Sequence, residues 1–316
     1  MSRQASGARG TSGGDAGNPR NASKSSDVKP NDEAPRSKLP AGLYLVATPI
    51  GNAADITLRA LDVLRRADVI ACEDTRFTGK LLARHGISAN LTPYHDHNAD
   101  RARPAILARL AQGQAVALVS DAGSPLVSDP GFKLVRASVD AGYPVTAIPG
   151  ASAAVVALQL SGLPIDRFLF AGFLPARQAA RQKALSKLAS VPASLVFFES
   201  PNRLGESVAD MVETLGDRPA AIARELTKLY EEVRRGTLSE LAAHYRDAGP
   251  PKGEIVIVVG GPRETAMSEE DLDARLLQAL ENLSLRDAAA VVASETGMPK
   301  REIYARALAV SRGRHK

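Results

Sequence analysis

The chain has 316 residues, of which 44% are hydrophobic and 4% aromatic, and its net charge is +5. This length predicts two domains, or two domains and an appendage. The only cysteine, Cys72, excludes an internal disulfide framework. No run of about 18 apolar residues occurs, and the first residues lack the apolar stretch of a secretory signal. We therefore expect a cytoplasmic protein without a membrane span.

Positive charge is concentrated at the two ends of the chain. Residues 1–38 carry seven Lys or Arg against four Asp or Glu, residues 300–316 carry six against one, and the rest is slightly negative. Basic ends on a near-neutral body favour an anionic macromolecular partner, although basic tails that only aid solubility are the alternative. Residues 1–38 contain almost no aliphatic residue, so we expect them to be a disordered tail.

From residue 39 to residue 150, short apolar runs alternate with helical patterns. This alternation predicts an N-terminal α/β domain with an open, largely parallel sheet and helices on both faces. The expected strands are 43–47, 68–73, 91–94, 115–119 and 144–148, and the expected helices are 56–66, 78–85, 101–111 and 132–141.

A second α/β domain is expected at residues 151–264, where the helix 153–161 follows the first sheet. Two α/β domains joined by a short helical segment predict a cleft between them. The expected strands are 168–173, 194–199, 220–225 and 254–259, with an antiparallel strand at 233–236, and the expected helices are 177–189, 203–215 and 239–245.

Residues 265–316 read as a purely helical appendage. Two caps are expected, Ser268 with Asp271 and Ser284 with Asp287. Basic residues gather at the start of the last helix and in the tail, and this favours contact with nucleic acid. The alternative is a three-helix bundle that packs in a dimer. The pattern rests on an apolar face of Leu272, Leu276, Leu280 and Leu283, on the helix-turn-helix spacing of Ala293, Gly297 and Ile303, and on Lys300, Arg301 and Arg306.

One loop is unusual for its density of turn residues. Residues 119–131 read VSDAGSPLVSDPG, after the strand 115–119 and before the helix 132–141. Gly123 and Gly131 allow backbone angles that other residues disfavour, and the two prolines restrict the chain. Open α/β sheets bind ligands beyond the carboxyl ends of their strands, so the loop predicts a binding site, with an ordinary connection as the alternative.

Several common chemistries are excluded. TPIGN at residues 48–52 has too few glycines for a dinucleotide fingerprint, and neither a P-loop nor a GxSxG nucleophile elbow occurs. His95 and His97 lie beside Asp96, but no clustered ligands elsewhere complete a metal site, and we expect no metal. A cleft and a glycine-opened loop without a nucleophile are typical of a transferase that positions two substrates.

Six motifs occur in a fixed order along the chain, namely LYLVATPIGN, ACEDTR, VSDAGSPLVSDPG, IPGAS, FFESPNR and ARELTKLYEE. Together they resemble the ribosomal RNA small subunit methyltransferase I family of tetrapyrrole-methylase-like enzymes. The resemblance covers about residues 39–261, and the helical end resembles that family's helix-turn-helix extension. The TPIGN turn departs from the glycine-richer turn of the broader class, which argues against a porphyrin-type substrate.

The resemblance implies two α/β domains of the tetrapyrrole methylase type and a homodimer without metal. It implies S-adenosylmethionine as cofactor and 2′-O-methylation of one cytidine in the decoding region of 16S rRNA, on the small ribosomal subunit. The positions that match the family's cofactor contacts are Pro49, Asp121, Ala122, Gly123, Ser124, Pro125, Ser152, Ala153, Phe198, Leu226 and Glu254.

Methyl transfer to a ribose hydroxyl also needs groups that hold the acceptor and take up a proton. We expect Arg76 and Lys228 to contact phosphate or ribose. Glu199 or Asp74 is the expected proton acceptor, and His95 is a weaker candidate. Each of these residues has a structural alternative, as a salt bridge at a strand end or as a helix cap.

Two other functions remain open from the sequence. A methylase of a small tetrapyrrole-like acceptor explains the cleft and the loop but does not explain the basic helical end. A DNA-binding regulator that uses this helical end does not explain the two α/β domains.

Overall fold

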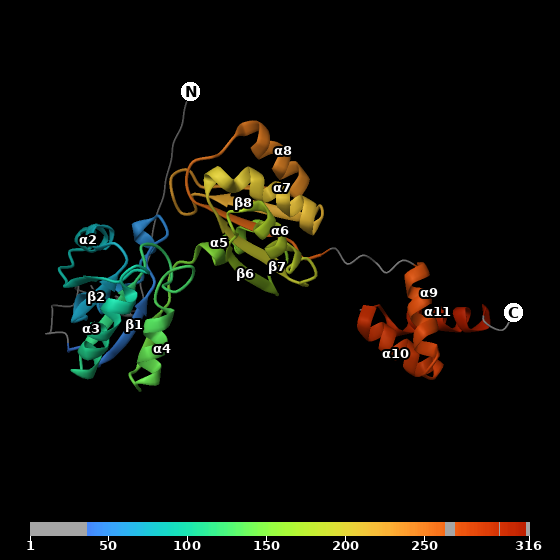
Figure 1. The fold of residues 1–316 in the computed structure, drawn as a ribbon, viewed down its shortest axis with the longest axis horizontal. Helices are drawn as coiled ribbons and strands as arrows, with labels where there is room; N and C mark the ends of the chain where they lie inside the picture. The colour runs from blue at the N-terminus through green and yellow to red at the C-terminus, as the bar shows by residue number, and fades with distance from the viewer. Residues whose placement is uncertain (1–36, 263–268, 297, 314–316) are drawn as a thin grey trace, which may run out of the picture. The chain divides into compact units, whose positions relative to one another are not determined.

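The computed structural model describes residues 37–262, 269–296 and 298–313 (Figure 1). The expected tail up to residue 36, the cap residue Ser268 and the turn residue Gly297 lie outside the described residues. Within the described ranges, no helix combines the length and the apolar character that crossing a membrane requires.

The first sheet consists of five parallel strands in the order β3-β2-β4-β1-β5. The central strand β4 is buried along its whole length, as expected for a strand covered on both faces. Because all strands are parallel, their carboxyl ends meet at one edge of the sheet. The strands are β1 (Gly42–Val46), β2 (Val69–Cys72), β3 (Leu91–Pro93), β4 (Ala115–Val119) and β5 (Val145–Ile148).

Helices cover both faces of this sheet, as predicted. Neighbouring residues of one strand enter different cores: Ala117 of β4 packs in one cluster and Leu118 in the other. The helix after β2 was expected to begin at Thr78 but begins at Thr75, because the Asp74 carboxylate accepts the Arg76 N–H and caps it. The helices are η1 (Ala53–Asp55), α1 (Leu58–Arg66), α2 (Thr75–Arg84), α3 (Ala99–Ala111) and α4 (Phe132–Asp140).

The second sheet is mixed, in the order β6-β7-β10-β8-β9. Only β6 and β7 are parallel. The expected antiparallel strand is confirmed as β9, and β10 is also antiparallel to both of its neighbours. The strands are β6 (Phe168–Phe173), β7 (Ser194–Glu199), β8 (Pro219–Arg224), β9 (Glu232–Thr237) and β10 (Ile255–Val259).

Two hydrophobic clusters flank this second sheet. Leu185, Leu204 and Leu241 of three helices pack with one face, and Ala157 and Leu158 of α5 pack with the other. The helices are α5 (Ala153–Ser161), α6 (Gln178–Ser186), η2 (Pro201–Arg203), α7 (Leu204–Leu215) and α8 (Leu238–Ala248).

A buried ion pair joins α6 to α7. Arg181 and Asp210 are each 2% exposed, and the Arg181 Nε donates to Asp210 Oδ2 at 2.5 Å. Gln178 and Gln182 donate to the other carboxylate oxygen. The pair is therefore satisfied on both sides, which a charge removed from water requires.

The C-terminal appendage contains α9 (Glu269–Leu280), α10 (Leu285–Thr296) and α11 (Lys300–Gly313). The Ser284 cap is confirmed, since its hydroxyl accepts the Asp287 N–H. Ile303 lies buried among the three helices, as the helix-turn-helix spacing predicted.

One expectation for this appendage is wrong. Leu283 follows the end of α9 and is 41% exposed, so it does not extend the apolar face of Leu272 and Leu276. Arg306 pairs with α9, because its guanidinium forms two hydrogen bonds with the Asp273 carboxylate.

Replacing Asp210 should destabilise the protein strongly. We expect Asp210→Ala to lower the free energy of unfolding by about 3–5 kcal/mol, because the buried Arg181 guanidinium loses its partner. The control Asp140→Ala breaks the exposed pair with Arg136 and should cost about 0–1 kcal/mol. Urea denaturation followed by circular dichroism measures both, and equal losses would contradict the assigned role of the buried pair.

Candidate functional site

The loop between β4 and α4 is attached to the end of β1 by a two-way backbone bridge. The Thr48 N–H donates to the Gly123 carbonyl at 2.8 Å, and the Gly123 N–H donates to the Thr48 carbonyl at 3.1 Å. Gly123 has a φ of 78°, as the sequence predicted for a position that needs glycine. Leu126 and Ser128 also have positive φ, at 73° and 65°. Such strained angles cluster at binding sites, where the surrounding structure maintains them.

A second strained loop follows β8. Glu225 and Thr227 have φ angles of 51° and 65°. The Thr227 hydroxyl accepts the Asn52 N–H at 3.0 Å, which ties this loop to the turn after β1. A Cβ on Gly51 would lie 2.4 Å from the Lys228 Cγ, so only glycine allows this approach. The turn after β1 therefore contacts both strained loops.

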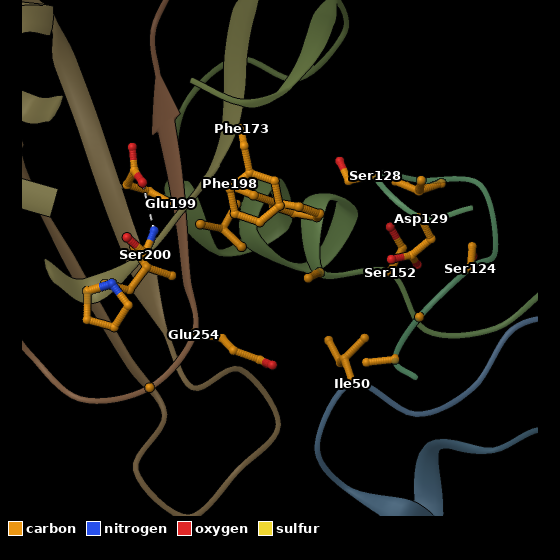
Figure 2. A pocket seen from close by; sticks show the side chains of 18 residues that line it. Ile50, Ser124, Ser128, Asp129, Ser152, Phe173, Phe198, Glu199, Ser200 and Glu254 are labelled. Carbon is orange, nitrogen blue, oxygen red and sulfur yellow. Dashed lines mark hydrogen bonds between the residues drawn. The ribbon is translucent and has the colours of Figure 1, made fainter. Parts of the chain in front are cut away.

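A cavity of about 380 Å³ lies between the β4–α4 loop and the ends of β7 and β10 (Figure 2). Its volume falls in the range of small-molecule sites. Phe198 and Phe173 form an apolar wall, with ring centroids 5.6 Å apart. Figure 2 shows Ser124, Asp129 and Ser152 opposite these rings, so the cavity has an apolar side and a polar side.

A second cavity of about 530 Å³ adjoins the first. Ile50, Ala122 and Glu254 line both cavities, so the two spaces share a wall. A molecule in each would meet at these three residues. The remaining lining residues of the second cavity are Pro49, Gly51, Ala53, Phe77, Lys80, Leu81, Arg84, Asp121 and Lys228.

The structure brings most of the residues expected to bind the cofactor to these two cavities. Pro49 and Asp121 line the second cavity only. Pro125 and Leu226 line neither, and both are buried beneath their loops. The residues that line the first cavity are Ala122, Gly123, Ser124, Ser152, Ala153, Phe198 and Glu254.

Ser152 is the N-cap of α5, but its side chain makes no capping hydrogen bond. The first N–H groups of a helix have no partner within the helix, and they favour an anionic or polar acceptor. The start of α5 thus offers donors to the polar side of the first cavity.

The candidate proton acceptors Glu199 and Asp74 are both engaged within the protein. Glu199 borders the first cavity, but its carboxylate accepts hydrogen bonds from Ser200 N, Ser207 Oγ and Arg203. Asp74 borders neither cavity, and its pKa lies well below the ordinary range because Arg76 donates to it from side chain and backbone. A lowered pKa makes a carboxylate a weaker proton acceptor.

The two candidate cations differ in position. Lys228 lines the second cavity and donates to Glu225 at 2.7 Å and to Glu254 at 3.0 Å. Burial lowers the pKa of Lys228, but these two carboxylates more than compensate and leave it raised, so Lys228 stays protonated. Arg76 is paired with Asp74, its side chain is 87% exposed, and it borders neither cavity.

The histidine motif has no place at either cavity. His95 and His97 lie with ring centroids 6.0 Å apart, and neither lines a cavity described above. Among the residues that the structure describes, no group of three or more His, Cys, Asp or Glu is arranged to hold a metal ion.

Sequence reasoning missed more than half of the residues that line the cavities. Ser200 and Pro201 could have been found, because they belong to the FFESPNR motif that singled out Phe198. Phe77, Lys80 and Arg84 could not, because their spacing on α2 is typical of an ordinary solvated helix face.

Three carboxyls with mutual electrostatic effects lie at the β4–α4 loop: Asp121 and Asp129 belong to the loop, and Glu73 directly follows β2. Burial raises the pKa of Glu73, and the charges of Asp121, Asp129 and Asp96 raise it further. Burial also raises the pKa of Asp121, against the opposing effect of the Asp74 N–H that it accepts at 3.1 Å. The pKa of Asp129 is raised by burial and then by Asp121 and Asp96, although Ser120 donates to it. These carboxyls hold protons more tightly than ordinary ones.

Comparison with known families gives two matches. Residues 42–242 match the tetrapyrrole (corrin/porphyrin) methylases, and residues 266–311 match the RsmI C-terminal HTH domain. The chain is 54% identical over 277 residues to "Ribosomal RNA small subunit methyltransferase I" of Mesorhizobium japonicum, covering 87% of this chain and 94% of that protein. It is 47% identical over 272 residues to the protein of the same name from Escherichia coli O157:H7, covering 84% and 94%.

Solved structures show the same fold. Uroporphyrin-III-C-methyltransferase from Thermus thermophilus matches with a TM-score of 0.52 and 26% identity, over 70% of this chain and 94% of that one. The methyltransferase CobJ matches with a TM-score of 0.53 and 21% identity, over 70% and 94%, which supports the fold alone.

Neutralising Glu73 should stabilise the protein more at high pH than at low pH. The folded-state pKa of Glu73 is raised, so its contribution to stability is present at low pH and is lost as pH rises through that pKa. We therefore expect Glu73→Gln to melt close to the wild type near pH 4 and above it near pH 8. Calorimetry at both pH values measures this.

Repeating the Glu73→Gln substitution in an Asp121→Asn background tests whether the charge of Asp121 causes this pH dependence. Because Asp121 repels the Glu73 carboxylate, the gain from Glu73→Gln at high pH should shrink there. If the increase in melting temperature caused by Glu73→Gln were independent of pH, or unchanged by Asp121→Asn, the raised pKa of Glu73 would not have an electrostatic origin.

Proposed function

Because the chain belongs to the tetrapyrrole methylase family, among its ribosomal RNA small subunit methyltransferase I members, we propose that it methylates the 2′-hydroxyl of a cytidine in the decoding region of 16S rRNA. S-adenosylmethionine is the proposed methyl donor, and the small ribosomal subunit is the proposed substrate. The observation that carries this proposal is the pair of cavities that share Ile50, Ala122 and Glu254. A donor in one and an acceptor in the other would meet at that shared wall.

The first cavity fits S-adenosylmethionine. Its apolar wall of Phe173 and Phe198 suits the flat adenine or the carbon chain of the cofactor. Its polar side offers the backbone of Gly123 and the uncapped start of α5 at Ser152, which suit ribose hydroxyls and a carboxylate. We propose that these residues hold the cofactor, together with the Ser124 and Glu254 side chains.

Bound S-adenosylmethionine supplies an electrophilic methyl group on a sulfonium. The protein must then keep the acceptor hydroxyl in line with that methyl and exclude competing water. The Thr48–Gly123 bridge and the strained loop give the donor side a fixed shape. Lys228, held by Glu225 and Glu254 beside the second cavity, is placed to orient a ribose or phosphate oxygen of the acceptor.

We assign the proton acceptor to Asp121. It lines the second cavity next to the shared wall, and its raised pKa makes it a better base than Asp74, whose pKa is lowered. Glu199 holds three internal hydrogen bonds, and a role in fixing the end of β7 accounts for it. We propose Asp121 in place of Glu199 or Asp74, the two alternatives expected from the sequence.

The helix-turn-helix appendage is proposed to bind the ribosomal substrate. Its sequence match is to a domain of that type, and Lys300 and Arg301 at the start of α11 are exposed. We also propose that the protein works as a cytoplasmic homodimer without a metal. We take residues 39–150, 151–264 and 265–316 as its three domains, after the N-terminal tail 1–38.

The proposal is tested by methyl transfer from labelled S-adenosylmethionine to small subunits purified from a strain that lacks this protein. We expect one labelled nucleotide, a 2′-O-methylcytidine in the decoding region, identified by mass spectrometry of nuclease fragments. Subunits from the parent strain serve as the control and should accept no label, because their site is already methylated. Cofactor binding without transfer to small subunits would contradict the rRNA assignment and favour a small tetrapyrrole-like acceptor.

Filling the shared wall should impair binding and transfer together. Ala122 lines both cavities, so Ala122→Phe should weaken S-adenosylmethionine binding by about 5- to 150-fold, the equivalent of the 1–3 kcal/mol cost of overpacking. Ala248→Phe is a matched control, since Ala248 is also exposed and lines a separate cavity beside Arg224. Isothermal titration measures both, and equal affinities would place the cofactor elsewhere.

A further inference from the structure

One face of α2 forms a side of the second cavity. Phe77, Lys80, Leu81 and Arg84 line it, and their spacing of three, four and seven residues places them on one face of the helix. The cavity thus has a continuous wall that carries one aromatic ring, one aliphatic side chain and two cations.

The two cations of this face have no partner within the described part of the chain. Neither Lys80 nor Arg84 forms an ion pair or side-chain hydrogen bond with a described residue, and both are exposed. Lys228, the third cation of the cavity, is paired with Glu225 and Glu254. Lys80 and Arg84 are therefore available to an anion that enters the second cavity.

Phe77 adds an exposed aromatic surface to the same face. It is 53% exposed, although Phe is a residue that folding normally buries. An exposed ring beside two unpaired cations is the combination that binds single-stranded nucleic acid, in which bases stack on rings and phosphates meet Lys and Arg. Aliphatic Leu81 lies between the two cations and gives the wall an apolar base.

The loop that supplies Lys228 to the cavity also exposes apolar groups. Leu229 and Tyr230, which directly follow Lys228, are 87% and 68% exposed. A small acceptor enclosed in the cavity would not reach side chains that project so far into solvent. Exposed apolar side chains beside a site mark contact with a larger partner.

We propose that the α2 face of Phe77, Lys80 and Arg84 holds the single-stranded RNA next to the nucleotide that is methylated. Phe77 stacks on a neighbouring base, and Lys80 and Arg84 bind the backbone phosphates. This proposal rests on the function proposed above and deepens it, because it assigns the residues that select RNA as the acceptor.

The cations are tested with Lys80→Ala/Arg84→Ala, assayed by methyl transfer to small subunits from the strain that lacks the protein. KM for the subunits should rise about tenfold or more at physiological salt, because two charge-assisted contacts are lost, while kcat falls less. The dependence of log KM on log salt should also become shallower by about 1.4, or 0.7 for each lost phosphate contact. Lys183→Ala/Lys187→Ala, in α6 and at its C-cap, is the matched control, since it removes two exposed lysines that line neither cavity.

The ring is tested with Phe77→Ala and Phe77→Trp. Loss of one stacked base should raise KM for the subunits about 5- to 150-fold in Phe77→Ala, and Phe77→Trp should retain most of the wild-type value. Phe132→Ala is the control, because Phe132 is 69% exposed at the start of α4 and lines neither cavity.

The outcomes separate this inference from the proposed function. If the wild type methylates the subunits but the α2 variants match their controls in KM and salt dependence, the inference is wrong and the function stands. If S-adenosylmethionine binding falls with KM unchanged, the face serves the cofactor, which also overturns the inference. If the wild type itself does not methylate the subunits, the proposed function fails first.

Discussion

The candidate site depends on the two backbone hydrogen bonds that join Thr48 to Gly123. They extend the parallel pairing of β1 and β4 by one antiparallel bridge beyond the strand ends. The Asp74 N–H, which donates to Asp121, is a further attachment of the long β4–α4 loop, and together these bonds maintain a loop with positive φ angles at Leu126 and Ser128. The bridge works because Gly123 adopts a positive φ and lies against Ile50, which lines both cavities.

The two α/β parts are linked by a second set of close contacts, from the turn after β1. Asn52 donates to Thr227, and Gly51 lies against the Lys228 side chain. Lys228 in turn is held by carboxylates of the β8–β9 loop and of the residue before β10. One short turn therefore contacts both the β4–α4 loop and the lysine of the second cavity, and its residue Ile50 lines both cavities.

Both signs of charge occur around the two cavities. Asp129 lines the first cavity, and Asp121 lines the second together with Lys80 and Arg84 of α2. Glu73, Asp121 and Asp129 are half-buried, and their pKa values are raised. In the function proposed above, the unpaired cations of α2 would face the anionic backbone of the RNA acceptor.

The sequence by itself determined the order of helices and strands, the importance of the loop 119–131 and the family, because each depends on local periodicity or on contiguous motifs. It also identified Gly123, Ser152 and Phe198, which belong to such motifs and line the first cavity. Only the tertiary structure decided that Arg306 pairs with Asp273, that the Glu199 carboxylate accepts hydrogen bonds within the protein, and that α2 lines the second cavity. These facts depend on residues far apart in the chain, and local patterns carry no information on which distant side chains meet.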